Sequence, residues 1–147
     1  MNKKYAIIFS TALMVFILDH LTKFLVKQNL QFGQSTPIIE NVFHLTYITN
    51  TGSAFGLFKG FNLFFILFSI AVIAIVIYHT TKIKKDEITL QLAVGLLLGG
   101  TIGNLMDRIF HGSVVDFIDF RIWPVFNMAD SAVTISVILL AILLWKK

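Results

Sequence analysis

The chain has 147 residues, of which 56% are hydrophobic and 14% are charged, and it contains no cysteine. Its mean hydropathy of +0.82 is far from that of an ordinary soluble domain, and its length predicts a single domain over residues 1–147. The lack of cysteine excludes disulfides, thiol catalysis and cysteine-based zinc sites in this chain.

Four apolar stretches each approach the roughly 20 residues that a helix needs to cross a bilayer. In chain order they are residues 5–26, 61–78, 88–106 and 128–145. The first follows Lys3 and Lys4 and could be mistaken for a secretory signal peptide. However, no small-residue cleavage site closes it, and Asp19 and Lys23 continue the helix, so we interpret it as a retained span.

Strand-forming residues lie between the first and second apolar stretches. Residues 38–48 alternate in part between apolar and polar side chains, and a turn signal at residues 50–52 follows them. This pattern predicts one or two short strands on the membrane surface. Residues 51–57 then combine small and aromatic side chains, which fits either a membrane re-entry loop or a functional segment.

The third stretch contains three small residues at close helical spacing: Gly99, Gly100 and Gly103. Small residues let helices approach each other closely within a membrane, so we predict a helix contact there. Residues 114–122 then predict a short strand or a partly buried turn. Pro124 disfavours helix just before it, so the fourth helix should begin after Val125 with Asn127 as its N-cap.

Basic residues predict the orientation of the four spans. Seven of the twelve lie on one side of the membrane: Lys3, Lys4, Lys82, Lys84, Lys85, Lys146 and Lys147. Since the cytoplasmic side carries the excess of Lys and Arg, both termini should be cytoplasmic, with residues 28–60 and 107–127 outside. The net charge of +4 does not indicate nucleic-acid binding, because no basic patch with interleaved aromatics lies outside the bilayer.

Polar chemistry is concentrated in residues 99–130, which contain four of the six aspartates and both arginines. A charge near lipid costs several kcal/mol unless it is paired or hydrated, so we interpret this cluster as a functional site. Asp107 and Arg108 could be a charged pair that ends the third helix. Alternatively, Asn104 and Arg108 hold the backbone of a substrate while Asp107 orients them.

Asp116 and Asp130 are candidates for acid–base chemistry. Asp116 stands between Val115 and Phe117, where burial would raise the pKa of its carboxyl group. Asp130 lies in the first turn of a helix, where the helix dipole favours negative charge. Two carboxyls in unlike environments can divide acid and base roles and activate water for attack on a peptide carbonyl. The alternatives are a surface aspartate and a helix-start charge.

Other sites are less well supported by the sequence. Asp19 and Lys23 are four residues apart on one helix face, which predicts an ion pair near the interface with a structural role. A serine–lysine dyad of Ser53 and Lys23 is possible, but the spacing does not select it. The four histidines lack metal-ligand spacing.

Five sequence blocks resemble those of the lipoprotein signal peptidases (signal peptidase II), which are bacterial membrane aspartic proteases. FILDHLTK (16–23) matches the family's Asp-x-x-Ser/Thr-Lys, and NTGSAFG (50–56) matches Asn-x-Gly-Ala/Ser-Ala-Phe. The other blocks are GNLMDR (103–108), VVDFIDF (114–120) and FNMADSAVTIS (126–136). The resemblance covers nearly the whole chain. It implies four transmembrane helices with a small extracytoplasmic β element.

The resemblance also implies roles for individual residues. Asp116 and Asp130 match the catalytic aspartates, and Asp19 and Asp107 match structural acidic positions, with Lys23 supporting them. The positions that match polar residues lining the substrate site are Asn50, Asn104, Arg108 and Asn127. Asp107 could replace Asp116 in the pair, but its adjacent arginine and its place at a helix end favour Asp116. Asp130 is expected to be the more acidic partner.

The expected substrate is a prolipoprotein whose lipobox cysteine carries diacylglycerol, with cleavage just before that cysteine. The resemblance implies no metal or cofactor, membrane lipid as the surroundings, and a monomer. The location would be the bacterial cytoplasmic membrane, with the site towards the extracytoplasmic face. The alternative function is a small four-span proton-coupled transporter, since intramembrane acids mark such pathways too.

Overall fold

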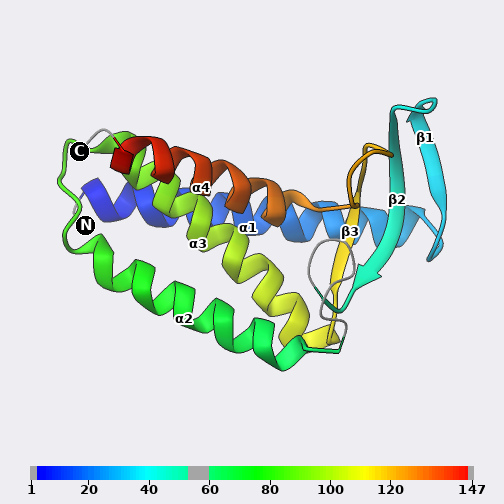
Figure 1. The fold of residues 1–147 in the computed structure, drawn as a ribbon, viewed down its shortest axis with the longest axis horizontal. Coiled ribbons are helices and arrows are strands. Elements are labelled where there is room, and N and C mark those ends of the chain that lie inside the picture. The colour runs from blue at the N-terminus through cyan, green and yellow to red at the C-terminus, as the bar shows by residue number, and fades with distance from the viewer. Residues whose placement is uncertain (1–2, 53–59, 146–147) are drawn as a thin grey trace.

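The computed structural model describes residues 3–52 and 60–145, which form four helices and one three-stranded sheet (Figure 1). The sheet lies at one end of the helices, while both chain ends and the α2–α3 connection lie at the other. The elements are, in chain order, α1 (Lys3–Asn29), β1 (Ser35–Ile39), β2 (Phe43–Asn50), α2 (Asn62–Thr80), α3 (Ile88–His111), β3 (Val114–Asp119) and α4 (Met128–Trp145).

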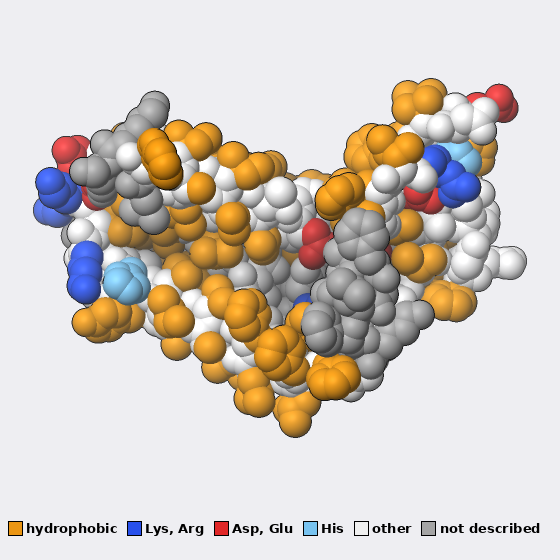
Figure 2. Space-filling view, viewed as in Figure 1, with side chains coloured by type: hydrophobic (Ala, Val, Ile, Leu, Met, Phe, Trp, Pro, Cys, Tyr) orange, Lys and Arg blue, Asp and Glu red, His pale blue; other side chains and the backbone are white. Residues whose placement is uncertain are grey.

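The helices have the character of membrane spans. α1, α2 and α3 are each long and apolar enough to cross a membrane, and α4 is an apolar helix of 18 residues. Figure 2 shows hydrophobic side chains over the outer surface of the helices, with charged groups gathered mainly towards the two ends. The prediction of a helical membrane protein with a small β element is therefore confirmed.

The helix α3 is central and packs against the other three helices. Its glycines allow the close contacts that the sequence predicted. A Cβ atom on Gly99 would lie 2.5 Å from the Ala12 carbonyl oxygen in α1, and one on Gly100 would lie 2.5 Å from the Ala129 carbonyl oxygen in α4. Gly95 makes a similar approach to α1 that the sequence analysis did not single out.

The helix α3 extends beyond the uncharged stretch 88–106 that was predicted as the third span. It continues to His111 and ends at Gly112, whose φ of 70° gives the left-handed C-cap. Because no residue before Gly112 interrupts the helix, Asp107 and Arg108 belong to its last turns. The start of α4 agrees with the prediction, since the Asp130 N–H donates to Asn127 Oδ1 over 2.9 Å as in an N-cap.

The α2–α3 connection is held by a buried lysine. Lys4 is almost fully buried, and its Nζ donates to the carbonyl oxygens of Thr80 at 2.9 Å and Ile83 at 3.0 Å. A cation at a helix C-terminus satisfies carbonyls that have no partner within the helix. Lys4 therefore fixes the connection beside the start of α1, in addition to adding to the positive charge at this end.

The sheet has the strand order β1-β2-β3, and both pairs are antiparallel. The residues predicted to form one or two strands form β1 and β2, and the alternative of strand or turn after α3 resolves as strand β3. Val115 and Phe117 of β3 pack with Val26 of α1 in a buried cluster, which fixes the sheet to the helices. The prediction for residues 51–57 falls largely on 53–59, outside the described residues.

Candidate active site

The two candidate aspartates come from different elements and line one cavity. Asp116 lies in the middle of β3 and is 2% exposed, whereas Asp130 lies in the first turn of α4 and is half-buried. The cavity has a volume of about 320 Å³, and Asn50, Arg108 and aromatic side chains also line it. This volume lies at the lower end of the range for small-ligand sites.

Asn127 joins the two carboxyl groups. Its side-chain Nδ2 donates to Asp116 Oδ1 over 2.7 Å, and its backbone N–H donates to Asp130 Oδ2 over 3.2 Å. Its own Oδ1 accepts the Asp130 N–H, so Asn127 and Asp130 form a reciprocal cap at the start of α4. One fully buried residue thus fixes both carboxyls relative to each other.

Two further side-chain amides bond to the remaining oxygen of each aspartate. Asn104 Nδ2 donates to Asp130 Oδ1 over 2.7 Å, and Asn50 Nδ2 donates to Asp116 Oδ2 over 3.2 Å. We expected all three asparagines to line the substrate site. Asn50 is among the described residues that line the cavity, whereas Asn104 and Asn127 are buried beside the carboxyls. The contacts of Asn104 and Asn127 hold Asp130 and Asp116, and their place in the substrate site stays a prediction.

The pKa of Asp116 is raised to about 7. Burial is the main cause, because it penalises the charged form, and the nearby Asp130 carboxyl raises the pKa further. Hydrogen bonds from Asn127 and Asn50 act in the opposite direction, since they favour the carboxylate. Asp116 can therefore carry a proton near neutral pH, as a general acid must.

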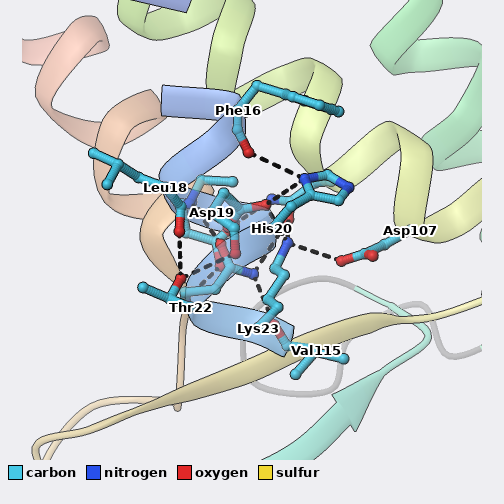
Figure 3. A network of polar contacts seen from close by, with 12 residues as sticks. Phe16, Leu18, Asp19, His20, Thr22, Lys23, Asp107 and Val115 are labelled. Carbon is cyan, nitrogen blue, oxygen red and sulfur yellow. Dashed lines mark hydrogen bonds and ion pairs between the residues drawn. The ribbon is translucent and has the colours of Figure 1, made fainter. Parts of the chain in front are cut away.

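Lys23 belongs to a second polar network, in which Asp107 of α3 reaches it (Figure 3). Its Nζ is 2.6 Å from Asp19 Oδ2 and 2.8 Å from Asp107 Oδ2, and it donates to Asn104 Oδ1 over 3.1 Å. Asp19 also accepts the Ala129 N–H of α4 over 3.0 Å through its other oxygen. The network therefore ties α1 and α3 to the first turn of α4.

Asp19 and Lys23 form the predicted ion pair, and they are 0% and 2% exposed within the protein. Asp107 pairs with Lys23, which in turn donates to Asn104 Oδ1. Three helices meet at this ion pair, which the spacing along one helix could not show.

Arg108 points towards the cavity from α3. Its Nη2 donates to the Gly52 carbonyl oxygen over 3.3 Å, and its guanidinium carbon lies 5.0 Å from the centre of the Phe65 ring. Its Nε is buried and has no hydrogen-bond partner among the described residues. Because Arg108 lines the cavity, other N–H groups of its guanidinium can donate a hydrogen bond to a group that enters it.

The mainly apolar wall of the cavity was not predicted from the sequence; it includes Phe65, Trp123, Phe126, Val133 and Thr134. Val133 and Thr134 were detectable, since they follow Asp130 by three and four residues on one helix face. Phe65 carries no such signal because it comes from α2, and Trp123 carries none because it lies in the irregular segment between β3 and α4. The serine–lysine alternative lost support, since both Asp19 and Asp107 engage the Lys23 ammonium group, and Ser53 lies outside the described residues.

Comparison with known proteins gives a consistent family assignment. Residues 11–146 match the family described as signal peptidase (SPase) II. The lipoprotein signal peptidase of Halothermothrix orenii is 44% identical over 140 residues, which cover 95% of this chain and 96% of that protein. That of Bacillus subtilis is also 44% identical, over 89% of this chain and 88% of its own length.

A solved structure shows the same architecture. It is described as a bacterial membrane enzyme, superposes with a TM-score of 0.87 and is 36% identical in sequence. The match covers 92% of this chain and 85% of the other.

Proposed function

The chain belongs to the signal peptidase II family, and on that premise we propose that it removes the signal peptides of lipoprotein precursors with Asp116 and Asp130 as its catalytic pair. The observation that carries this assignment is that both carboxyls line one cavity and are joined by Asn127. The transporter alternative is not supported, because the relatives are peptidases.

The proposed mechanism is general acid–base proteolysis. Ionised Asp130 removes a proton from water, and protonated Asp116 donates a hydrogen bond to the scissile carbonyl oxygen as the water attacks. The raised pKa of Asp116 and the place of Asp130 at a helix N-terminus support this division of roles. The proton taken by Asp130 then passes to the leaving amine, so that each carboxyl returns to its starting state.

Arg108 and Asn50 are the proposed substrate-positioning residues, because both line the cavity and carry N–H donors. Asn104 and Asn127 hold the catalytic carboxyls, and Asp19, Lys23 and Asp107 support them from behind. We propose that the substrate is a prolipoprotein with a diacylglyceryl cysteine. The apolar cavity wall of Phe65, Val133 and Trp123 is compatible with a lipid-bearing residue.

We further propose a monomer in a bacterial cytoplasmic membrane, with the sheet and the site on the extracytoplasmic side. The positive residues near the opposite end support this orientation, since excess Lys and Arg mark the cytoplasmic side. The chain's own carboxyls and amides supply every step of the proposed mechanism.

The test is cleavage of a diacylglyceryl prolipoprotein by purified Asp116→Asn and Asp130→Asn variants. Each should lose cleavage by at least the ~10²–10⁴-fold typical of acid–base groups, while the protein remains membrane-inserted. Asp86→Asn is the matched control, since Asp86 is exposed in the α2–α3 connection, and it should cleave normally. If Asp116→Asn still cleaves, Asp116 is not a catalytic residue, and Asp107 becomes the candidate partner of Asp130.

A further inference from the structure

The strand β2 contains one more residue than β3 in the paired region. Leu45 pairs with Ile118 and Ile48 pairs with Asp116, so three steps along β2 match two steps along β3. The extra residue is a β-bulge at positions 46–47. A one-residue shift moves every following side chain to the other face of a strand, and bulges are known to redirect side chains next to active sites.

The bulge determines where Asn50 points. Ile48 and Asn50 pair with Asp116 and Val114, so they share the face of Asp116, and the Asn50 amide reaches Asp116 Oδ2. If the pairing of Leu45 with Ile118 continued without a bulge, Thr49 would stand opposite Val114 and Asn50 would project from the opposite face. The contact between Asn50 and Asp116 therefore depends on the bulge.

A buried hydrogen bond holds the bulge on the other face of the sheet. Thr46 Oγ1 donates to Asp119 Oδ2 over 2.7 Å, and both residues are buried. The backbone N–H and Nη1 of Arg121 also donate to the Asp119 carboxylate, over 2.8 Å and 3.0 Å. The Tyr47 backbone bonds to Gly33 and Gln34 instead of β3, so the bulged residue has partners elsewhere.

The ionised form of Asp119 is suited to holding the Thr46 hydroxyl group. Burial raises the pKa of its carboxyl group, but the hydrogen bonds from Thr46 and Arg121 outweigh burial and hold the pKa below its ordinary value. A hydrogen bond to an ionised acceptor is about twice as strong as one between neutral groups. Asp119 is three residues from Asp116 on the opposite face of β3 and is not among the described residues that line the cavity.

Building on the proposed function, we propose that Asp119 is a positioning residue of the peptidase: its bond to Thr46 fixes the β2 bulge and so holds the Asn50 amide on Asp116. Asp119 touches no reacting atom in this proposal. It acts through Thr46, the bulge and Asn50, in that order.

The test compares Thr46→Val with Asn50→Ala in cleavage of the diacylglyceryl prolipoprotein. Valine keeps the shape of threonine but removes the donor to Asp119, together with the 2.8 Å contact between Thr46 Oγ1 and Ser35 Oγ. Both variants should lower kcat by about tenfold, the order of effect of one hydrogen bond. Thr46→Val should change KM little, whereas Asn50→Ala should also raise KM, because Asn50 lines the cavity. The double variant should be no slower than Asn50→Ala alone, because both changes remove the same contact.

The pH profile separates positioning from a purely structural role. Since the Asn50 amide favours ionised Asp116, its loss should move the alkaline limb of activity to higher pH, equally in both variants. The other charged groups around Asp116 remain in place in these variants: Asp130 from α4, Arg108 from α3 and Lys23 from α1. Asp119 itself faces Arg121, and His44 stands opposite it on β2.

Three controls complete the test. Thr49→Val makes the same change at an exposed position of β2 and should leave kcat and the pH profile unchanged. Thr46→Ser retains the hydroxyl group and should restore activity, which covers the case in which Thr46→Val folds poorly. Asp116→Asn, assayed alongside, shows separately whether the catalytic pair is correct.

Two results would overturn the proposal. One is a lower melting temperature of Thr46→Val with unchanged kcat and pH profile, which would make the bond only structural. The other is a double variant whose loss is the product of the single losses. Either result with an inactive Asp116→Asn rejects the positioning role alone, whereas an active Asp116→Asn rejects the catalytic pair.

Discussion

Asp116 and Asp130 are the same residue type, but different surroundings hold them. Asp116 is enclosed in a strand between apolar neighbours, and Asp130 lies half-buried at the start of a helix. Asn127 bonds to both, so the pair shares one rigid frame. We infer that burial keeps the Asp116 carboxyl protonated, while the start of α4 stabilises the negative charge of Asp130.

The raised pKa of Asp116 predicts how activity depends on pH. A general acid must be protonated, and ionisation of Asp116 as pH rises through about 7 removes that proton. The kcat/KM should therefore fall above pH 7, by about tenfold per pH unit. Measurement of kcat/KM from pH 5 to 9, with the melting temperature followed in parallel, checks this. A constant kcat/KM up to pH 9 in folded protein would contradict the role of Asp116 as the acid.

The residues of the site were easier to predict from the sequence than the partners to which they bond. Asp116 and Asp130 were singled out from an apolar neighbourhood and a helix start, both of which are local properties. By contrast, adjacency along the chain could only suggest Arg108 as a partner of Asp107, and only the structure shows its ion pair with Lys23 of another helix. Asp119 received no role, because its bond to Thr46 requires the pairing of β2 with β3.

For helices and strands too, features set by one segment of the chain could be predicted, whereas features set by contacts between segments could not. Apolar runs located all four helices, and the small residues of α3 located its contacts with α1 and α4. The uncharged stretch marked the third span but not the end of its helix, which continues through Asp107 and Arg108 to the C-cap at Gly112. The bulge in β2 could not be predicted, since it is a relation between two strands and not a property of either.

The glycine contacts of α3 predict two distinct effects of added bulk. Gly99→Ala places a methyl group against the α1 backbone and should destabilise the protein by about 1–3 kcal/mol. Gly100→Ala presses on the carbonyl group of Ala129, which is next to Asp130, so it should also lower kcat. Melting temperature and cleavage rate of each variant in detergent measure the two effects.

The control for these variants is Ala74→Val, which adds bulk at an exposed position of α2 and should change neither quantity. Equal kcat losses in Gly99→Ala and Gly100→Ala would show that helix packing affects activity only through stability. A Gly100→Ala variant that is as stable and active as the wild type would reject the close contact itself.

At the scale of the whole molecule, two buried lysines fix opposite ends of the bundle. Lys4 holds the connection between α2 and α3 at the end where the termini lie, and Lys23 ties α1 and α3 to the start of α4 beside the site. A buried cation with two carboxylates is costly to break, because loss of the lysine leaves unpaired charges in the interior. Buried charges therefore stabilise the fold at both ends of the bundle, and at the end beside the sheet they also form the proposed catalytic site.

The arrangement of both termini at the end opposite the sheet leads to a prediction about orientation in the membrane. Because the chain lacks cysteine, single cysteines can be placed at two exposed acidic positions: Glu40 between β1 and β2, and Asp86 between α2 and α3. In intact cells, a membrane-impermeant maleimide should label Glu40→Cys, whereas Asp86→Cys should react only after permeabilisation. The positive charge near Asp86 is the physical reason, since positive segments are retained in the cytoplasm. The wild-type chain is the control and should not be labelled under either condition. The reverse pattern would put the sheet and the catalytic pair on the cytoplasmic side, where a secreted lipoprotein precursor could not present its cleavage site after crossing the membrane.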